Sequence, residues 1–205
     1  MSTIKQNPQI KRTKRLLQDA LIELLKEKQY QKITVTDIVT RAGLSRTTFY
    51  AHYDYKEELI EQCLEDLLAV IFYDSFSNVQ SFPSSPNGNA FPPSPMQERG
   101  SISNLVRHWK NNHSLFRTFE EAGLEKIILK IYMEQHQLIF QEKLKERLPF
   151  TPNQELIDYY LVFLSSTQVG ILQHWLATNM EMPVETLIDF LTVVNSPSLF
   201  LKLIR

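Results

Sequence analysis

The sequence predicts an all-α protein. Apolar residues recur at the three- and four-residue spacing of amphipathic helices along most of the 205 residues. We find no convincing segment in which apolar and polar residues alternate as they do in a half-buried strand. Charged residues make up 22% and apolar residues 43% of the chain, a balance that excludes wholesale disorder.

Local capping signals divide the first part of the chain into short helices. Helices are expected over about residues 9–29, 35–42, a segment that follows Ser45, and 55–75. Thr34 and Asp37 have the spacing of an N-cap and its acidic N3 partner. Gly43 is placed to end the second helix in the left-handed conformation, and Ser45 is placed to cap the third. The first helix has an apolar stripe formed by Leu16, Leu17, Ala20, Leu21, Leu24 and Leu25.

A Pro/Ser-rich stretch over residues 75–100 interrupts the helical pattern. It contains five of the ten prolines and two of the five glycines, so we expect a long loop there. Helices are expected to resume over about residues 101–122, 124–148, 152–180 and 184–194. Thr151 and Gln154 have the spacing of an N-cap and its N3 partner at the start of the third of these.

Charge is distributed unevenly along a chain whose net charge is −1. Residues 1–56 carry 11 Lys+Arg against 5 Asp+Glu, a balance of +6, and residues 57–205 carry 11 against 18, a balance of −7. A basic first quarter suggests that this part meets an anion. The single cysteine excludes an intramolecular disulfide, and the longest apolar run, seven residues from Leu67 to Tyr73, is too short to span a membrane. A soluble, cytoplasmic protein is expected.

The most informative segment, residues 34–53, reads T-V-T-D-I-V-T-R-A-G-L-S-R-T-T-F-Y-A-H-Y. Two short helices joined by a tight turn predict a helix-turn-helix, over about residues 35–54, whose second helix enters the DNA major groove. A small core between the helices is expected from Ile38, Ala42, Leu44 and Phe49. With Phe49 turned inward, the outward surface of the second helix holds Arg46, Thr47, Tyr50 and Ala51.

Together with the helix before it and the D-Y-K-E-E-L that follows, this segment resembles the DNA-binding domain of TetR/AcrR-family transcriptional regulators. The resemblance covers about residues 11–60 and fixes residue types and spacings over some 25 positions. It implies a DNA-binding domain over residues 1–56 and a ligand-binding and dimerisation domain over residues 57–205. The second part resembles the family only in its all-α architecture and its length.

The resemblance also implies which residues meet double-stranded DNA. Candidates for contact with base edges are Arg46, Thr47 and Ala51. Candidates for contact with phosphates are Thr36, Ser45, Thr48, Tyr50, His52 and Lys56. Thr47, Phe49 and Tyr55 depart from the usual family pattern, so the operator sequence does not follow from the resemblance. A basic stretch ahead of the motif is either a solvated tail or an arm that reaches the minor groove; it comprises Lys5, Lys11, Arg12, Lys14 and Arg15.

In the second part, aromatic residues and one histidine recur at helical spacing, a pattern typical of core packing. The family resemblance implies instead that they line a pocket for an unidentified small-molecule effector. They are Trp109, Phe116, Phe119, Tyr132, His136, Phe140, Tyr159 and Phe163. A homodimer is expected to form through the helices at 152–180 and 184–194, because the first carries two apolar stripes and only one can face its own core. One stripe consists of Ile157, Leu161, Leu164, Gln168, Ile171, Leu172 and Trp175, and the other of Tyr159, Val162, Phe163, Ser166 and Gly170. The interface candidates are Leu164, Gly170, Ile171, Trp175, Leu187 and Leu191.

The sequence favours a repressor that a small-molecule ligand releases from a palindromic operator. An activator or adaptor of the same fold is the first alternative, and a helical enzyme with a vestigial DNA-binding head is the second. No catalytic constellation, metal-ligand spacing, phosphate-binding loop or cofactor motif is recognisable in the sequence. The enzyme alternative is therefore disfavoured, and no metal or cofactor is expected.

Overall fold

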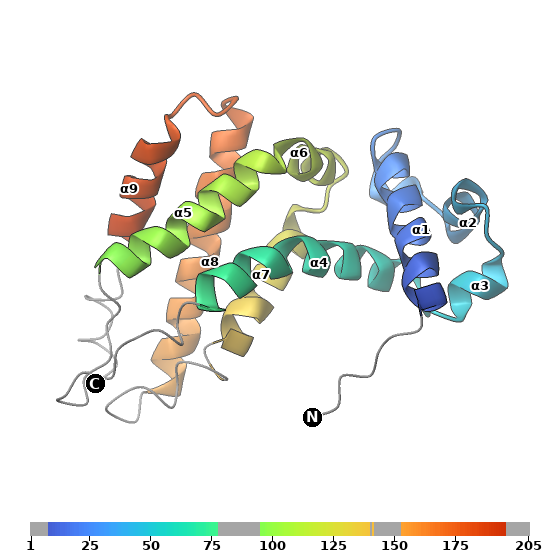
Figure 1. Ribbon diagram of the computed structural model, residues 1–205, viewed down its shortest axis with the longest axis horizontal. Coiled ribbons are helices and arrows are strands. Elements are labelled where there is room, and N and C mark those ends of the chain that lie inside the picture. Colours follow the sequence, from blue (N-terminus) through green and yellow to red (C-terminus); the bar gives the residue numbers. More distant parts are fainter. Residues whose placement is uncertain (1–7, 78–94, 140, 142–152, 196–205) are drawn as a thin grey trace. The chain divides into compact units, whose positions relative to one another are not determined.

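The computed structural model describes residues 8–77, 95–139, 141 and 153–195. Within these ranges the chain is all-α, as the sequence predicts (Figure 1). The elements are α1 (Pro8–Leu25), the 3-10 turn η1 (Tyr30–Lys32), α2 (Val35–Ala42), α3 (Arg46–Tyr50), α4 (Lys56–Ser77), α5 (Pro95–Asn111), α6 (His113–Glu121), α7 (Glu125–Ile139), α8 (Gln154–Ala177) and α9 (Val184–Val194). None of the helices in the described ranges has both the length and the apolar character needed to cross a bilayer.

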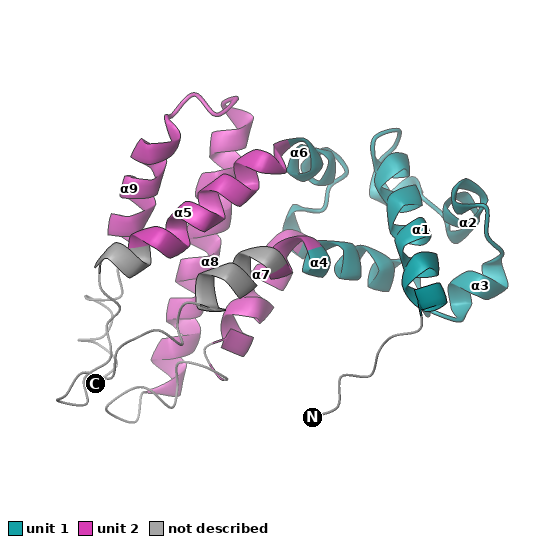
Figure 2. Cartoon of the chain, in the orientation of Figure 1, with its two compact units in different colours: residues 1–66, 114–127 teal, residues 67–113, 128–205 magenta. Residues whose placement is uncertain are grey.

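The chain divides into two compact units (Figure 2). The first consists of residues 1–66 together with 114–127, and the second of residues 67–113 together with 128–205. Residues 114–127 therefore group with the helix-turn-helix although they lie far along the sequence. One contact that joins them to it is the hydrogen bond from the Tyr30 amide to the Ala122 carbonyl, at 3.3 Å.

The local capping signals in the first unit are confirmed. Thr34 accepts a hydrogen bond from the Asp37 amide, and the Asp37 carboxylate accepts one from the Thr34 amide, so the capping box is complete. Gly43 adopts φ 66° and ψ 32°, the left-handed conformation expected of it. Helix α1 ends at Leu25, earlier than predicted. Its apolar stripe is buried as expected except for Leu16, whose side chain is exposed.

Three expectations for the later helices are wrong. The predicted helix over 101–122 is two helices, since α5 ends at Asn111 and α6 begins at His113. At the break the Asn112 side-chain amide donates to the His108 carbonyl at 2.9 Å, a local bond that competes with the helical pattern. The predicted loop over 75–100 is shorter, since its first three residues belong to α4 and its last six to α5; residues 78–94 lie outside the described ranges. Helix α8 is capped by Asn153, whose side chain accepts from the Leu156 amide at 3.3 Å; Thr151, the expected cap, is not among the described residues.

Helix α7 is described as far as Ile139, so the predicted extension to residue 148 falls largely outside the described ranges. Helix α9 has the predicted bounds and packs against α5. Exposed ion pairs join these two helices: Arg99 contacts Glu185 and Asp189, at 2.8 and 2.9 Å, and Arg107 contacts Glu185 at 2.6 Å. Apolar side chains of both helices are buried, among them Val106, Trp109, Ile188 and Leu191.

Candidate nucleic-acid interface

Helices α2 and α3 are held by a turn of three residues. The Gly43 amide donates to the Thr40 and Val39 carbonyls, and the Leu44 amide donates to the Val39 carbonyl at 2.9 Å. Ser45 then caps α3 by accepting from the Thr48 amide at 3.0 Å. Fully buried side chains of Ile38 and Phe49 lie on either side of the turn. Of the predicted core, Ala42 and Leu44 are half-buried, so the turn is anchored mainly by one residue from each helix.

The outward surface of α3 is the predicted one. Arg46, Thr47, Tyr50 and Ala51 are all exposed. The Arg46 guanidinium lies 5.9 Å from the centre of the Tyr50 ring, which itself meets the buried Phe49 ring edge-on at 5.4 Å. The Tyr50 ring therefore packs against the arginine guanidinium and is itself held by the buried Phe49 ring.

Four of the candidate phosphate-contacting residues fall into two groups. Thr36 is exposed and His52 is half-buried, and both lie on the surface of the helix-turn-helix. Ser45 and Thr48 are hydrogen-bonded to each other, with their hydroxyl oxygens 2.8 Å apart, so part of their hydrogen-bonding capacity already serves the α3 cap. These hydroxyls stand at the start of α3, where backbone amides also point outward.

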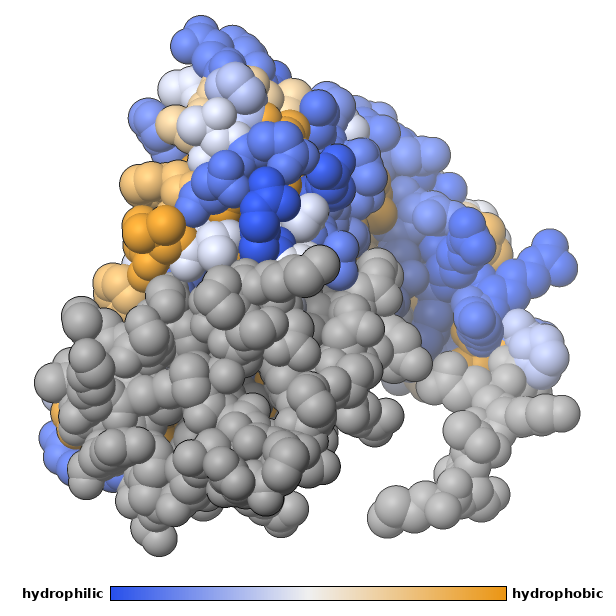
Figure 3. All heavy atoms as spheres, turned by 60° about the vertical axis from the view of Figure 1, so that its left-hand side comes forward, coloured by the Kyte–Doolittle hydropathy of each residue, from blue (hydrophilic) through white to orange (hydrophobic). Residues whose placement is uncertain are grey.

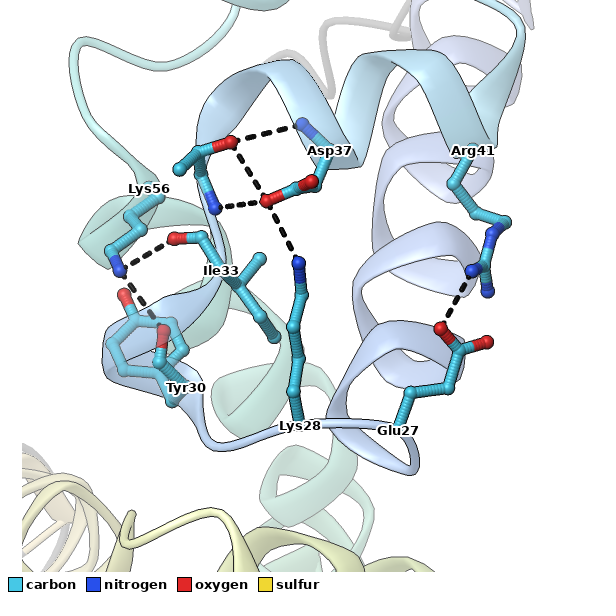
Figure 4. Close-up of polar contacts among 8 residues, drawn as sticks. Glu27, Lys28, Tyr30, Ile33, Asp37, Arg41 and Lys56 are labelled. Atoms are coloured by element: carbon cyan, nitrogen blue, oxygen red, sulfur yellow. Dashed lines mark hydrogen bonds and ion pairs between the residues drawn. The ribbon is translucent and has the colours of Figure 1, made fainter.

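Lys56 has an internal role that the sequence does not reveal (Figure 4). Its Nζ donates to the Ile33 carbonyl at 2.8 Å and to the Tyr30 carbonyl at 3.0 Å. The same ammonium lies 4.3 Å from the centre of the Tyr30 ring. Lys56 thus ties the first residue of α4 to the segment that leads into α2, and its expected phosphate contact remains a prediction.

Ion pairs join α2 to the end of α1 and the turn beyond it, as Figure 4 also shows. Arg41 contacts Glu27 at 2.8 Å and Glu23 at 3.4 Å, and Lys28 contacts Asp37 at 3.0 Å. The Thr34 amide and then the Lys28 ammonium lower the pKa of Asp37 to about 2. The carboxylate therefore stays ionised at neutral pH, and the capping box keeps its acceptor.

The basic stretch that precedes the motif is helical where it is described. Lys11, Arg12, Lys14 and Arg15 lie within the first two turns of α1, so they do not form an extended arm; Lys5 is outside the described residues. Lys14 packs inward, with Nζ 5.1 Å from the centre of the Tyr53 ring and 2.8 Å from Gln62 Oε1.

In the second unit the structure brings together part of the predicted pocket. Trp109, Tyr132 and His136 are buried and form a chain of contacts: Trp109 Nε1 lies 3.4 Å from the Tyr132 hydroxyl, and the Tyr132 and His136 rings are 5.5 Å apart. His136 Nδ1 lies 2.9 Å from the hydroxyl of Ser165, which is fully buried on α8. Burial lowers the pKa of His136 to about 4, so its imidazole is neutral at neutral pH.

Ser165 was not predicted as the partner of His136. A signal was present, because Ser165 falls four residues after Leu161 on the buried stripe of α8, where a small polar side chain is out of place without a partner.

The remaining pocket candidates do not join this buried cluster. Phe116 and Phe119 are buried, but they belong to the first compact unit. Tyr159 and Phe163 are 68% and 50% exposed on α8, against the expectation that they face inward. Phe140 lies outside the described residues.

Helix α8 carries the two predicted stripes. The stripe that contains Ile157, Leu161, Leu172 and Trp175 is buried in the unit's own core. The other stripe is exposed and consists of Tyr159, Val162, Phe163, Ser166 and Gly170.

Exposed apolar residues continue on α9, where Phe190 and Val193 are 48% and 77% exposed. Figure 3, which brings the side of α9 forward, shows apolar surface beside strongly polar surface. We call Tyr159, Val162, Phe163, Ser166, Gly170, Phe190 and Val193 the exposed α8–α9 face.

Half of the expected interface residues need correction. Trp175, Leu187 and Leu191 are buried within their own subunit, and the Trp175 indole donates to the Met182 carbonyl at 2.9 Å. These three side chains therefore belong to the subunit core. Leu164 and Ile171 are half-buried, and Gly170 is exposed.

The first unit thus has the geometry of a helix-turn-helix DNA-binding domain, followed by a second helical unit. Among the described residues, no cluster of histidine, cysteine and carboxylate side chains could hold a metal ion. The helix-turn-helix defines the class of protein as one that binds DNA through an inserted recognition helix.

Comparison with known proteins identifies the family. Residues 17–63 match the sequence model of the bacterial regulatory proteins of the tetR family, and residues 100–196 match that of a transcriptional regulator C-terminal region. The chain belongs to the TetR family, whose members are transcriptional regulators and not enzymes.

Three relatives illustrate the similarity. The chain is 28% identical over 181 residues to the HTH-type transcriptional regulator YxbF of Bacillus subtilis (strain 168), a match that covers 86% of the chain but only 42% of that longer relative. The crystal structure of a TetR transcriptional regulator from Streptococcus agalactiae 2603V is 25% identical, with TM-score 0.57, covering 92% of this chain and 96% of that one. A Clostridium perfringens protein shares the fold alone, at 16% identity and TM-score 0.51, covering 88% and 96% of the two chains.

Proposed function

We propose that the protein is a homodimeric repressor that binds a palindromic operator in the cytoplasm and is released from it by a small-molecule effector. The observation that carries the proposal is the exposed surface of α3, where Arg46, Thr47 and Tyr50 project from a helix fixed by a capped turn. Membership of a family of DNA-binding regulators makes DNA the partner of this surface.

The proposed DNA contacts divide by chemistry. Arg46 can contact guanine with two parallel hydrogen bonds, and Thr47 and Ala51 can contact a thymine methyl group. Thr36, Ser45, Thr48, Tyr50, His52 and Lys56 are the proposed phosphate contacts, which set the register of the helix without reading sequence. Only the first group is expected to control which operator is bound.

A dimer is supported by the exposed α8–α9 face. It places large apolar side chains in water within one subunit, and exposed apolar surface of this kind is typical of an interface between protein chains. Gly170 and Ser166 lie on the same face, where small residues allow a second helix to approach closely. A two-fold dimer would bury this face from both subunits and present two copies of α3 to successive major grooves, about 34–36 Å apart or somewhat more.

Binding of an effector is supported by the cluster of Trp109, Tyr132, His136 and Ser165. Aromatic surface with a few polar groups is the usual lining of a small-molecule site. A dimer has one conformation in which the two α3 helices are spaced to fit the operator and another in which they are not. A ligand that binds the second conformation more tightly would reduce operator affinity. The reduction is limited by the ratio of the ligand's affinities for the two conformations.

Selection of duplexes from a random-sequence library with the full chain tests the proposal. Enrichment of an inverted repeat, together with sedimentation as a dimer at micromolar concentration, would support it. Enrichment of no sequence would contradict the assigned role of α3, and a monomer would contradict the dimer. Small molecules that co-purify can be identified by mass spectrometry and added back, with loss of operator binding as the expected effect.

A further inference from the structure

Three exposed cations lie on the first turns of α1. Lys11, Arg12 and Arg15 are exposed. Arg12 and Arg15 lie on the side of the helix opposite to the buried residues Leu17, Leu21 and Leu24, and Lys11 lies at the edge of that side. No acidic residue precedes Asp19 in α1, so the described part of the helix begins with an uninterrupted positive surface. The function proposed above assigns nothing to these three side chains.

Lys14 fixes where the start of α1 lies relative to the helix-turn-helix. Its ammonium packs over the ring of Tyr53, which follows the end of α3 by three residues, and it donates to Gln62 on α4. One helical turn separates Lys14 from Lys11, about 4.5 Å along the axis. The basic start of α1 therefore lies close to the end of the recognition helix (Figure 1).

Pairing distinguishes these cations from others in the chain. Arg41, Lys28, Arg99 and Arg107 each contact a carboxylate at 3.0 Å or less. No ion pair between described residues involves Lys11 or Arg12. Arg15 lies 3.9 Å from the Asp19 carboxylate, and both of these side chains are exposed. Their charge is thus available to an external anion, whereas that of the paired cations serves the fold.

We propose that Lys11, Arg12 and Arg15 contact backbone phosphates of DNA that flank the groove entered by α3. This inference rests on the proposed function. The major groove is about 12 Å wide and its walls are phosphates, so a positive surface close to the inserted helix faces a strand. Duplex DNA carries one charge for about every 1.7 Å of its axis, which suits cations spaced along a helix. Such contacts add affinity and leave the choice of sequence unchanged.

The test compares two triple variants of the full chain on a duplex selected by the wild type. The first is Lys11→Gln, Arg12→Gln, Arg15→Gln. The control is Lys26→Gln, Lys110→Gln, Lys126→Gln, which removes the same charge from exposed lysines elsewhere. Affinity is measured between about 50 and 200 mM salt, and each phosphate contact contributes about 0.9 to the slope of log K on log salt. The first variant is expected to lower that slope by up to about 2.7 per DNA-binding unit, and the control to leave it unchanged.

Trimming the duplex from its ends supplies a second readout. The wild type should lose affinity when flanking base pairs are removed, whereas the first variant should lose less, because its contacts to those phosphates are already gone. Circular dichroism checks that both variants keep their helices. Equal slopes and equal trimming profiles for the wild type and the first variant would overturn the inference while leaving the proposed function intact. A wild type that selects no duplex would instead overturn the proposed function itself.

Discussion

Replacing Lys56 by methionine tests what holds the start of α4 against the segment before α2. Methionine keeps an unbranched apolar stem and removes the ammonium, so the Ile33 and Tyr30 carbonyls lose donors at 2.8 and 3.0 Å. A hydrogen bond to a charged group contributes about 1.5–3 kcal/mol, and a cation over an aromatic ring about 0.5–1 kcal/mol. Because these contributions are not additive, we expect a loss of about 2–4 kcal/mol in the free energy of unfolding.

Urea unfolding followed by circular dichroism measures this loss. Lys32→Met is the matched control, since Lys32 is an exposed lysine of η1 in the same neighbourhood. We expect the control to stay within about 0.5 kcal/mol of the wild type. A Lys56→Met protein as stable as the control would refute the assigned internal role. If that stable protein also bound its operator with a smaller salt slope, the phosphate contact would be the main role of Lys56.

Three further perturbations test separate parts of the molecule. Arg46→Ala should weaken binding to the selected operator by about 1–3 kcal/mol with an unchanged circular dichroism spectrum, and unchanged affinity would remove Arg46 from base readout. Gly170→Arg should yield monomers in sedimentation with an intact fold, because a Cβ at this exposed position meets no atom within 4 Å in its own subunit; a persistent dimer would place the interface elsewhere. The lowered pKa of Asp37 means that its stabilising effect is present above the unfolded value of 3.8 and is lost as the pH falls toward 2. In Asp37→Asn the urea midpoint of unfolding should therefore change less with pH between about 4 and 2 than in the wild type. Identical pH dependence in the two proteins would contradict the stabilising role assigned to the Asp37 carboxylate.

The helix-turn-helix could be predicted because its boundaries depend on local chemistry. The Thr34–Asp37 capping box, the left-handed Gly43 and the Ser45 cap each involve residues at most four positions apart. Sequence spacing alone therefore determines which donors and acceptors meet. The exposure of the outward residues of α3 follows from the burial of Phe49, since the helix has one inward side.

Features that depend on distant residues could not be predicted in the same way. The carbonyls that Lys56 contacts belong to residues 23 and 26 positions earlier in the chain. No periodicity connects a lysine with them, so the sequence suggests only a free cation near DNA. The pairing of His136 with Ser165 spans 29 positions and was missed for the same reason.

The two apolar stripes of α8 show the limit of periodicity most clearly. Spacing separates the stripes correctly, but it does not say which one faces the subunit's own core. Trp175 was predicted at the interface and Tyr159 in the pocket, whereas Trp175 is buried in its own subunit and Tyr159 is exposed. Exchanging these roles affects both proposals. It gives the proposed dimer face two aromatic side chains, Tyr159 and Phe163, of a kind that carries much of the binding energy in protein interfaces. It also removes both from the proposed effector site, whose polar groups are then His136 and Ser165. A neutral imidazole paired with a hydroxyl can donate to or accept from a ligand but cannot neutralise a charge, so the proposed site favours an uncharged effector with a hydrogen-bonding group.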